Sequence, residues 1–298
     1  MIVYLGWGAN FLALQYALYA FPVFLMNGSR NLLGGIILYV FQRLRGSERP
    51  TPEMWKSAFV VGFIMISCGA GPNVWAQSVV PSGVASLIIG SVPLWVVILE
   101  IINSKRNKTS GPNLLSIVGV CIGFAGIIFL IRPGMIMGIN IELHTFGAIT
   151  LICGSFFWAL GSIKARKALL PPSRILGSGM MMICGGVTLV IVGILKGESA
   201  QLSFENVTIH AVMGYLYTLL IASAFTFAVY SWLLTVAPVT LVSTFAFVSP
   251  IVAVILGIIV LDEVFTMRHF VASLMILAAV ALVIVASGLK PKVKPKKE

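Results

Sequence analysis

The sequence predicts an all-α polytopic membrane protein whose ten transmembrane helices form two inverted repeats of five. Three observations predict this fold class. Of the 298 residues, 59% are hydrophobic and only 10% are charged, whereas a soluble domain usually carries about 25% charged residues. Ten apolar segments each approach the roughly 20 residues that a helix needs to cross a bilayer. Paired prolines in the fourth and ninth segments indicate an internal repeat.

The ten apolar segments follow one another through short connections. They span residues 1–20, 22–41, 55–79, 81–102, 113–131, 145–163, 175–195, 211–235, 239–261 and 267–287. Only the connections 132–144 and 196–210 are sizeable, so we expect no soluble domain. The last eleven residues, 288–298, are basic and are expected to form a solvated tail.

The positive charges predict how the helices are oriented, because short cytoplasmic connections of membrane proteins carry an excess of Lys and Arg. With the N-terminus in the cytoplasm, sixteen of the twenty Lys and Arg residues lie in or beside inner connections and the tail. Only Arg132, Lys196 and Arg268 lie at outer connections. We therefore expect both termini in the cytoplasm and the chain in the plasma membrane, with the lipid bilayer as its partner. The same distribution explains the net charge of +11 without nucleic acid as a partner.

Paired prolines indicate the internal repeat. Pro81 and Pro93 lie 157 residues before Pro238 and Pro250, and ten of the 28 positions from 75 to 102 are identical at this offset without a gap. We expect hairpin turns at Pro81 and Pro238. Pro93 and Pro250 are expected near mid-membrane, where a proline frees a backbone carbonyl and produces a kink that suits gating. Simple packing kinks are the alternative.

The repeat also predicts the domain organisation. We expect a first five-helix repeat over residues 1–131, a second over 145–287, and the cytoplasmic tail over 288–298. Because five is an odd number, the two copies must cross the membrane in opposite directions. Inverted repeats with kinked helices are typical of transporters, in which one half rocks against the other around a central site.

Five stretches carry a family resemblance. They are WGANF (7–11), RNLLGGIILY (30–39), VPSGVASLIIGSVPLW (80–95), FWALGSIKARKAL (157–169) and APVTLVSTFAFVSPIVAVILGIIVLDEVFT (237–266). Taken in this order, they resemble the drug/metabolite transporter superfamily in its ten-helix EamA branch, over essentially the whole chain. The resemblance implies a central cavity surrounded by helices 1, 3, 4, 6, 8 and 9. It also implies a small-molecule substrate, with export of amino acids or related compounds in many members.

The polar and aromatic residues of these cavity helices are the candidate substrate-binding residues. They are Trp7, Asn10, Asn73, Trp75, Gln77, Ser91, Trp95, Trp158, Ser162, Tyr230, Trp232, Ser243 and Ser249. Ligand pockets are mostly apolar with a few placed polar groups, and this set has that character. Aromatic faces would suit an aromatic amino acid or an organic cation. For each residue, a lipid-facing or structural role is the alternative.

Arg30 lies deep in a predicted span, roughly 12 Å below its outer end at 1.5 Å per residue. A charge inside the membrane is a functional candidate by default, so Arg30 is a candidate for binding a charge on the substrate. A structural cation bonded to neighbouring helices is the alternative, because the resemblance places its helix at the periphery of the bundle.

Small residues predict close helix packing in the fifth and tenth segments. Gly119, Gly123 and Gly126 follow a G-x-x-x-G-x-x-G pattern, and Ala278 and Ala281 share the last spacing. Such stripes let the backbones of two membrane helices approach closely. A seam between two chains of a homodimer is the alternative.

Enzyme motifs are missing from the sequence: there is no H-E-x-x-H, no G-x-x-x-x-G-K-[ST] and no nucleophile elbow. We expect no catalytic residue, no metal and no cofactor. The sequence predicts a secondary transporter of small organic metabolites that works by alternating access, and export of amino acids or related compounds is the leading hypothesis. Import or exchange of cationic or phosphorylated metabolites is the alternative, and an intramembrane enzyme or a scaffold is a further one.

Overall fold

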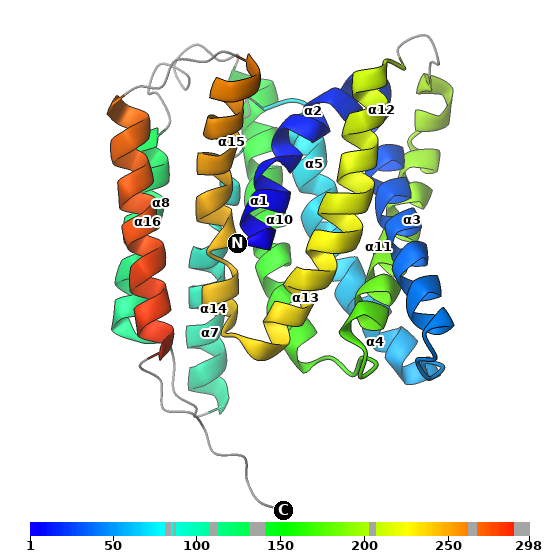
Figure 1. The fold of residues 1–298 in the computed structure, drawn as a ribbon, viewed down its shortest axis with the longest axis horizontal. Helices are drawn as coiled ribbons and strands as arrows, with labels where there is room; N and C mark the ends of the chain where they lie inside the picture. The colour runs from blue at the N-terminus through cyan, green and yellow to red at the C-terminus, as the bar shows by residue number, and fades with distance from the viewer. Residues whose placement is uncertain are drawn as a thin grey trace, which may run out of the picture.

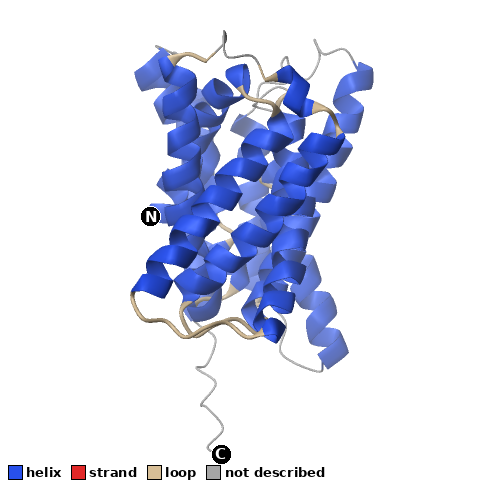
Figure 2. Cartoon of the chain, turned by 90° about the vertical axis from the view of Figure 1, so that its right-hand side faces the viewer, coloured by secondary structure: helices blue, strands red, loops and turns tan. Residues whose placement is uncertain are grey.

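The chain folds into a bundle of helices that run side by side (Figure 1). The structure is a computed structural model and describes residues 1–80, 85, 88–107, 112–130, 141–202, 207–261 and 267–288. Every regular element in these ranges is helical, as Figure 2 shows.

Five of the helices are long and apolar enough to cross a membrane by length and composition: Val23–Leu44, Pro52–Gln77, Phe146–Lys167, Arg174–Leu195 and Ile209–Val236. Shorter apolar helices cover Leu114–Gly126, Val239–Val252 and Phe270–Ala286. The chain is therefore an all-helical, multi-pass membrane protein. Its division into ten helices in two inverted repeats stays a prediction.

The elements of the first half of the chain fall within or near the predicted spans. They are α1 (Ile2–Gly8), α2 (Asn10–Ala20), α3 (Val23–Leu44), α4 (Pro52–Gly62), the π-helical segment η1 (Phe63–Ala70), α5 (Gly71–Gln77), α7 (Val92–Asn107) and α8 (Leu114–Leu130). Pro22 precedes α3 and Pro52 opens α4, where a missing backbone N–H costs nothing. The Thr51 side chain accepts a hydrogen bond from the backbone N–H of Met54 and so caps α4.

The second half of the chain is also helical in its described ranges. It holds α10 (Ile141–Lys167), α11 (Arg174–Leu195), the short 3₁₀ turn η2 (Glu198–Gln201), α12 (Ile209–Leu216), the π-helical segment η4 (Tyr217–Thr226), α13 (Phe227–Val236), α14 (Val239–Val242), α15 (Phe245–Leu261) and α16 (Met267–Gly288). Ser173 and Thr208 cap α11 and α12 through their side-chain oxygens.

Several predicted spans are interrupted, which hydropathy alone does not indicate. The segment 1–20 is divided between α1 and α2, and 239–261 between α14 and α15. Segments 55–79 and 211–235 each contain a long π-helical stretch, η1 and η4. A π-helix makes i→i+5 hydrogen bonds and is frequently found at functional sites. Apolar residues fit α- and π-helical turns equally well, so the hydropathy pattern cannot distinguish them.

Helices α3 and α11 pack backbone to backbone, and they lie next to each other on the right of Figure 1. A Cβ atom added at Gly186 would lie 2.5 Å from the backbone nitrogen of Leu32, and one added at Gly28 would lie 2.6 Å from that of Val190. Only glycine permits such an approach. This contact joins the first half of the chain to the second.

Helices α8 and α16 form a second close pair, at the left edge of the bundle in Figure 1. Added Cβ atoms at Gly119 and Gly126 would lie 3.1 Å and 3.4 Å from the backbone oxygens of Ala279 and Ala272. The expected small-residue packing is present, but its partners on α16 differ from the predicted ones: Ala278 and Ala281 are exposed. The helical register, set by burial of Ala272 and Ala279, turns them outward. Gly123 faces the ring of Phe247 instead.

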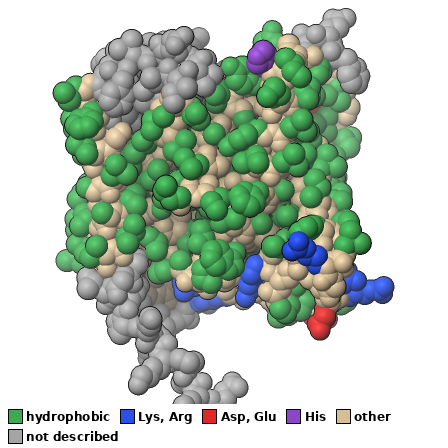
Figure 3. All heavy atoms as spheres, viewed as in Figure 1, with side chains coloured by type: hydrophobic (Ala, Val, Ile, Leu, Met, Phe, Trp, Pro, Cys, Tyr) green, Lys and Arg blue, Asp and Glu red, His purple; other side chains and the backbone are tan. Residues whose placement is uncertain are grey.

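The surface carries a broad apolar belt with charges at one edge. In Figure 3 hydrophobic side chains cover most of the face shown, and Lys and Arg side chains gather along its lower border. This edge is the one that the positive charges predict to be cytoplasmic, and the orientation itself stays a prediction.

Candidate functional site

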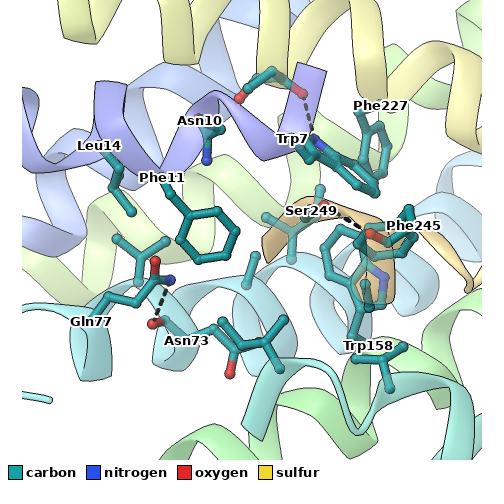
Figure 4. Close-up of a pocket in the computed structure, with 18 of the residues that line it drawn as sticks. Trp7, Asn10, Phe11, Leu14, Asn73, Gln77, Trp158, Phe227, Phe245 and Ser249 are labelled. Atoms are coloured by element: carbon teal, nitrogen blue, oxygen red, sulfur yellow. Dashed lines mark hydrogen bonds between the residues drawn. The ribbon is translucent and has the colours of Figure 1, made fainter. Parts of the chain in front are cut away.

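A cavity of about 130 Å³ lies inside the bundle, between helices from both halves of the chain (Figure 4). In Figure 4, Asn10, Phe11 and Leu14 approach it from one side and Asn73 and Gln77 from the other, while Trp7, Trp158, Phe227 and Phe245 gather at one end. The lining side chains are mostly apolar and include a few polar groups. They belong to Trp7, Asn10, Phe11, Leu14, Arg30, Asn31, Ile66, Ala70, Asn73, Val74, Gln77, Ile89, Val92, Trp158, Ala222, Ser223, Phe227, Phe245, Ala246, Ser249 and Pro250.

An aromatic cluster forms one end of this cavity. The ring centroid of Trp7 lies 4.5 Å from that of Phe245 and 5.4 Å from that of Trp158, in edge-to-face geometry. The Trp7 indole N–H donates to the carbonyl of Ala222, 3.0 Å away, which holds the ring against the π-helical segment η4. Edge-to-face pairs of this kind stabilise a defined packing, so the cluster presents fixed aromatic surface to the cavity.

Tyr230 supports Trp158 from behind. Its side chain is fully buried, and its hydroxyl accepts the Trp158 indole N–H at 3.2 Å. The same hydroxyl lies 2.8 Å from the Ser162 Oγ atom, one helical turn along α10. Tyr230 and Ser162 therefore do not line the cavity, but they set the position of a tryptophan that does.

The opposite wall is polar. Arg30 and Asn31 of α3 contribute to it together with Asn73 and Gln77 of α5 and Asn10 of α2. The Gln77 side chain donates to the Asn73 carbonyl at 3.0 Å. Among the side chains that the structure describes, the buried Oδ1 atoms of Asn10 and Asn73 have no hydrogen-bond partner. Buried polar atoms without a partner are uncommon. The Asn73 Oδ1 atom lies against Gly154 of α10, so a ligand in the cavity is an explanation for the Asn10 Oδ1 atom alone.

Many lining residues occur in pairs with one separation. Ile66 and Ser223 both line the cavity and are 157 residues apart, as are Val92 and Ser249. Two further lining pairs at this separation are Ala70 with Phe227 and Ile89 with Ala246. The Ile66–Ser223 and Ala70–Phe227 pairs lie at or beside the π-helical segments η1 and η4. The offset read from the prolines thus recurs among the residues that surround the cavity.

The predicted site residues divide into three groups. Those that line the cavity are Trp7, Asn10, Arg30, Asn73, Gln77, Trp158, Ser249 and Pro250. Those directly behind it are Ser162 and Tyr230. The other predicted residues lie away from the cavity. Trp75 packs on Phe146 and Trp95 on Phe156, while Trp232 is 49% exposed. The hydroxyls of Ser91 and Ser243 donate to the carbonyls of Ile88 and Thr240, three residues earlier in the chain.

The cavity also has lining residues that the sequence analysis missed. The larger ones are Phe11, Leu14, Asn31, Phe227 and Phe245. Asn31 directly follows Arg30, which is the one local signal that pointed to it. The apolar residues have no such signal, because every span of this protein contains similar ones.

The prolines occupy different positions in their helices. Pro250 lies inside α15 and lines the cavity, and it has no N–H for the carbonyl of Ala246 one turn earlier. Pro93 instead lies in the first turn of α7, where a proline fits without breaking a hydrogen bond. Pro93 therefore opens a helix, whereas Pro250 lies inside one, and a gating role for either proline stays a prediction. Pro238 directly precedes α14, as expected for a turn, and Pro81 lies outside the described residues.

An all-helical, multi-pass bundle around an aromatic-lined cavity is typical of membrane transport proteins. A sequence profile of the EamA-like transporter family matches residues 1–132 and 145–285. The chain belongs to this family, which confirms the resemblance seen in the sequence.

Similar proteins are found in bacteria and plants. The chain is 30% identical over 297 residues to YedA of Escherichia coli (strain K12), described as an uncharacterized inner membrane transporter, covering 98% of this chain and 92% of YedA. It is 26% identical over 282 residues to the chloroplastic WAT1-related protein At3g02690 of Arabidopsis thaliana, covering 93% and 66%. A crystal structure of another protein shares the fold at 17% identity, with a TM-score of 0.74 over 96% of this chain and 95% of that one.

Proposed function

We propose that the protein is a secondary transporter that moves a small organic metabolite through this cavity by alternating access, and that it exports amino acids or related compounds. The observation that supports this proposal is the set of lining pairs separated by 157 residues. An inverted repeat places its substrate site where the two copies meet, near mid-membrane. The cavity has the expected composition for such a site, with aromatic surface and a few polar groups.

Contacts between the predicted repeats suit a rocking motion. The Tyr4 hydroxyl of α1 lies 2.8 Å from the Thr244 hydroxyl, at the interruption between α14 and α15. The Trp7 indole N–H reaches Ala222 in η4. Both are single hydrogen bonds between segments more than 200 residues apart, so they can break and reform as the two halves move. Export and amino acids as cargo rest on the family resemblance and on the aromatic wall.

Counterflow in proteoliposomes tests the transport function. Vesicles with purified protein would be preloaded in turn with aromatic, aliphatic and hydroxy amino acids and with organic cations, and entry of the labelled solute would be followed with and without a pH gradient. We expect saturable counterflow with amino acids. If folded protein in sealed vesicles gives no counterflow with any of these solutes, amino acids and organic cations are excluded as substrates. Phosphorylated metabolites as substrates, or a scaffold role, would then be the remaining alternatives.

Two tryptophan variants connect that signal to the cavity. Trp158→Ala removes part of the aromatic wall and is expected to lower counterflow at least tenfold. Trp232→Ala is the matched control, because Trp232 is 49% exposed and does not line the cavity. Equal activity of the two variants would contradict this cavity as the substrate site. Direction is tested separately: cells that express the protein should lose preloaded amino acid faster than cells without it.

A further inference from the structure

Arg30 is a buried cation in the wall of the cavity. Its side chain is only 7% exposed, and it lines the pocket from α3, the helix that the family resemblance placed at the periphery. Taking a charge out of water costs free energy that must be recovered by a partner of opposite charge or by hydrogen bonds. The question is therefore which group compensates Arg30.

The described carboxylates do not compensate it. Glu198 is the buried acid nearest to the start of α3, but its two oxygens accept the backbone N–H groups of Phe24 and Leu25 at 3.2 Å and 2.8 Å. The Glu100 carboxylate accepts the Thr240 hydroxyl at 2.7 Å. Glu48 and Glu53 are exposed, near the opposite end of α3. Within the described part of the chain, Arg30 has no ion pair.

The local hydrogen bonds orient the guanidinium group. Its Nε–H donates to the Asn27 Oδ1 atom at 2.9 Å, and Asn31 Nδ2 donates to the same oxygen at 3.1 Å. The Asn27 amide nitrogen in turn lies 3.5 Å from the carbonyl of Ala70, at the end of η1. One of five guanidinium N–H donors is thus used among the described residues, and the Nη1–Nη2 end keeps its donors. That end is the fork which binds a carboxylate in bidentate geometry.

We propose that Arg30 binds the carboxylate of the transported solute, with Asn27 as a positioning residue that holds the guanidinium by its Nε. This inference rests on the proposed transport function and names its substrate class: a small organic carboxylate whose apolar part contacts the aromatic end of the cavity. One guanidinium balances one carboxylate. A phosphate monoester carries about −1.5 to −2 charges at pH 7 and would lack a second cation among the described lining residues.

The test uses two sets of probes, each with one apolar group (phenyl or isobutyl) and different charged groups. One set is 3-phenylpropionate, phenylalanine, phenethylamine and phenyl phosphate; the other is 4-methylpentanoate, leucine and isopentylamine. Ligands that bind the folded state raise its unfolding temperature, so thermal unfolding of the purified full chain in detergent measures binding. We expect the carboxylates of at least one set to stabilise the protein while its amine does not. An amine or phenyl phosphate that binds as well, or no binding by any carboxylate, would overturn the proposal.

Variants assign the effect to Arg30. We expect Arg30→Gln to weaken carboxylate binding at least tenfold and Arg30→Lys to weaken it less, because the charge stays while the bidentate fork is lost. Arg45→Gln is the control, since Arg45 is exposed at the other end of α3. Carboxylate binding that survives in Arg30→Gln would refute the site.

Asn27→Asp tests the same carboxylate site if the Arg30 variants do not fold. This substitution is nearly isosteric and supplies a carboxylate beside Arg30, so it should compete with the solute. We expect carboxylate binding to fall at least tenfold in a protein that still unfolds cooperatively, because the new ion pair with Arg30 offsets the hydrogen bond that Asn27 donates to the Ala70 carbonyl. A purely structural Arg30 predicts unchanged ligand binding instead.

Counterflow separates failure of this inference from failure of the transport function. Carboxylate binding that needs Arg30 but is never followed by counterflow would leave the anion site standing and refute transport. Counterflow of an amine at a rate that Arg30→Gln does not change would leave transport standing and refute the anion site.

Discussion

At the scale of single residues, the positions of the cavity-lining side chains depend on residues that do not line the cavity themselves. Tyr230 and Ser162 lie behind Trp158. The Tyr230 hydroxyl bridges the Trp158 indole N–H and the Ser162 hydroxyl. Asn27 has the same relation to Arg30. Each of these polar groups is buried and fixes a neighbour by a hydrogen bond, and a hydrogen bond is stronger in a buried environment than in water. Small changes behind the wall should therefore alter binding while leaving the lining residues in place.

Tyr230→Phe tests this support. The change removes only the hydroxyl, so the Trp158 indole N–H loses its acceptor while the ring packing is kept. A lost hydrogen bond costs about 1 kcal/mol, which corresponds to about a fivefold weaker affinity. The half-saturation concentration of counterflow measures it. Tyr19→Phe, at a residue that is 73% exposed, should leave that value unchanged; an equal response of both variants would contradict the supporting role.

At the scale of helices, the bundle combines closely packed helix pairs with helix interruptions. The pairs α3–α11 and α8–α16 approach each other through glycine and alanine, which makes them rigid supports. The interruptions, η1, η4 and the break between α14 and α15, lie around the cavity. Regular helices are stiff, whereas π-helical turns and breaks change the direction of side chains and interrupt the regular backbone hydrogen bonds of the helix. We therefore expect stability to depend on the close pairs and transport on the interruptions.

Gly186→Ala tests the close pair α3–α11. The new methyl group would lie 2.5 Å from the backbone nitrogen of Leu32, which cannot move aside. Overpacking of this kind costs about 1–3 kcal/mol, so the unfolding temperature in detergent should fall. Gly177→Ala on the same helix meets only side-chain atoms at 3.4 Å or more and should not lower it. Equal unfolding temperatures for the two variants would show that the contact adds little.

At the scale of the whole molecule, the charge distribution and the repeat predict one arrangement. Lys and Arg side chains gather at the lower edge of the bundle in Figure 3, where the cytoplasm is expected. The separation of 157 residues relates both the prolines of the sequence and the lining pairs of the cavity. Two copies of a five-helix unit with opposite orientations would give this result, with the cavity between them.

Single-cysteine labelling tests the orientation. In a chain whose native cysteines are replaced, we expect Gln201→Cys to react with a membrane-impermeant thiol reagent in intact cells, because η2 lies at the predicted outer edge. Lys167→Cys, at the end of α10, should react only after the cells are permeabilised. The reverse pattern would invert the predicted topology and with it the expected direction of transport.

The sequence alone determined the membrane class, the approximate spans, the family and the candidate residues Trp7, Asn73, Trp158 and Arg30. These follow from composition, hydropathy and a fixed offset, which are sums or spacings along the chain. Only the tertiary structure decided that Trp75, Trp95 and Trp232 lie away from the cavity, that Phe245 and Asn31 line it, and that Asn27 holds Arg30 by its Nε. In a span that is apolar on all sides, hydropathy does not distinguish one helical face from another. Which face meets the cavity depends on helix rotation, π-helical turns and glycine contacts between helices distant in sequence.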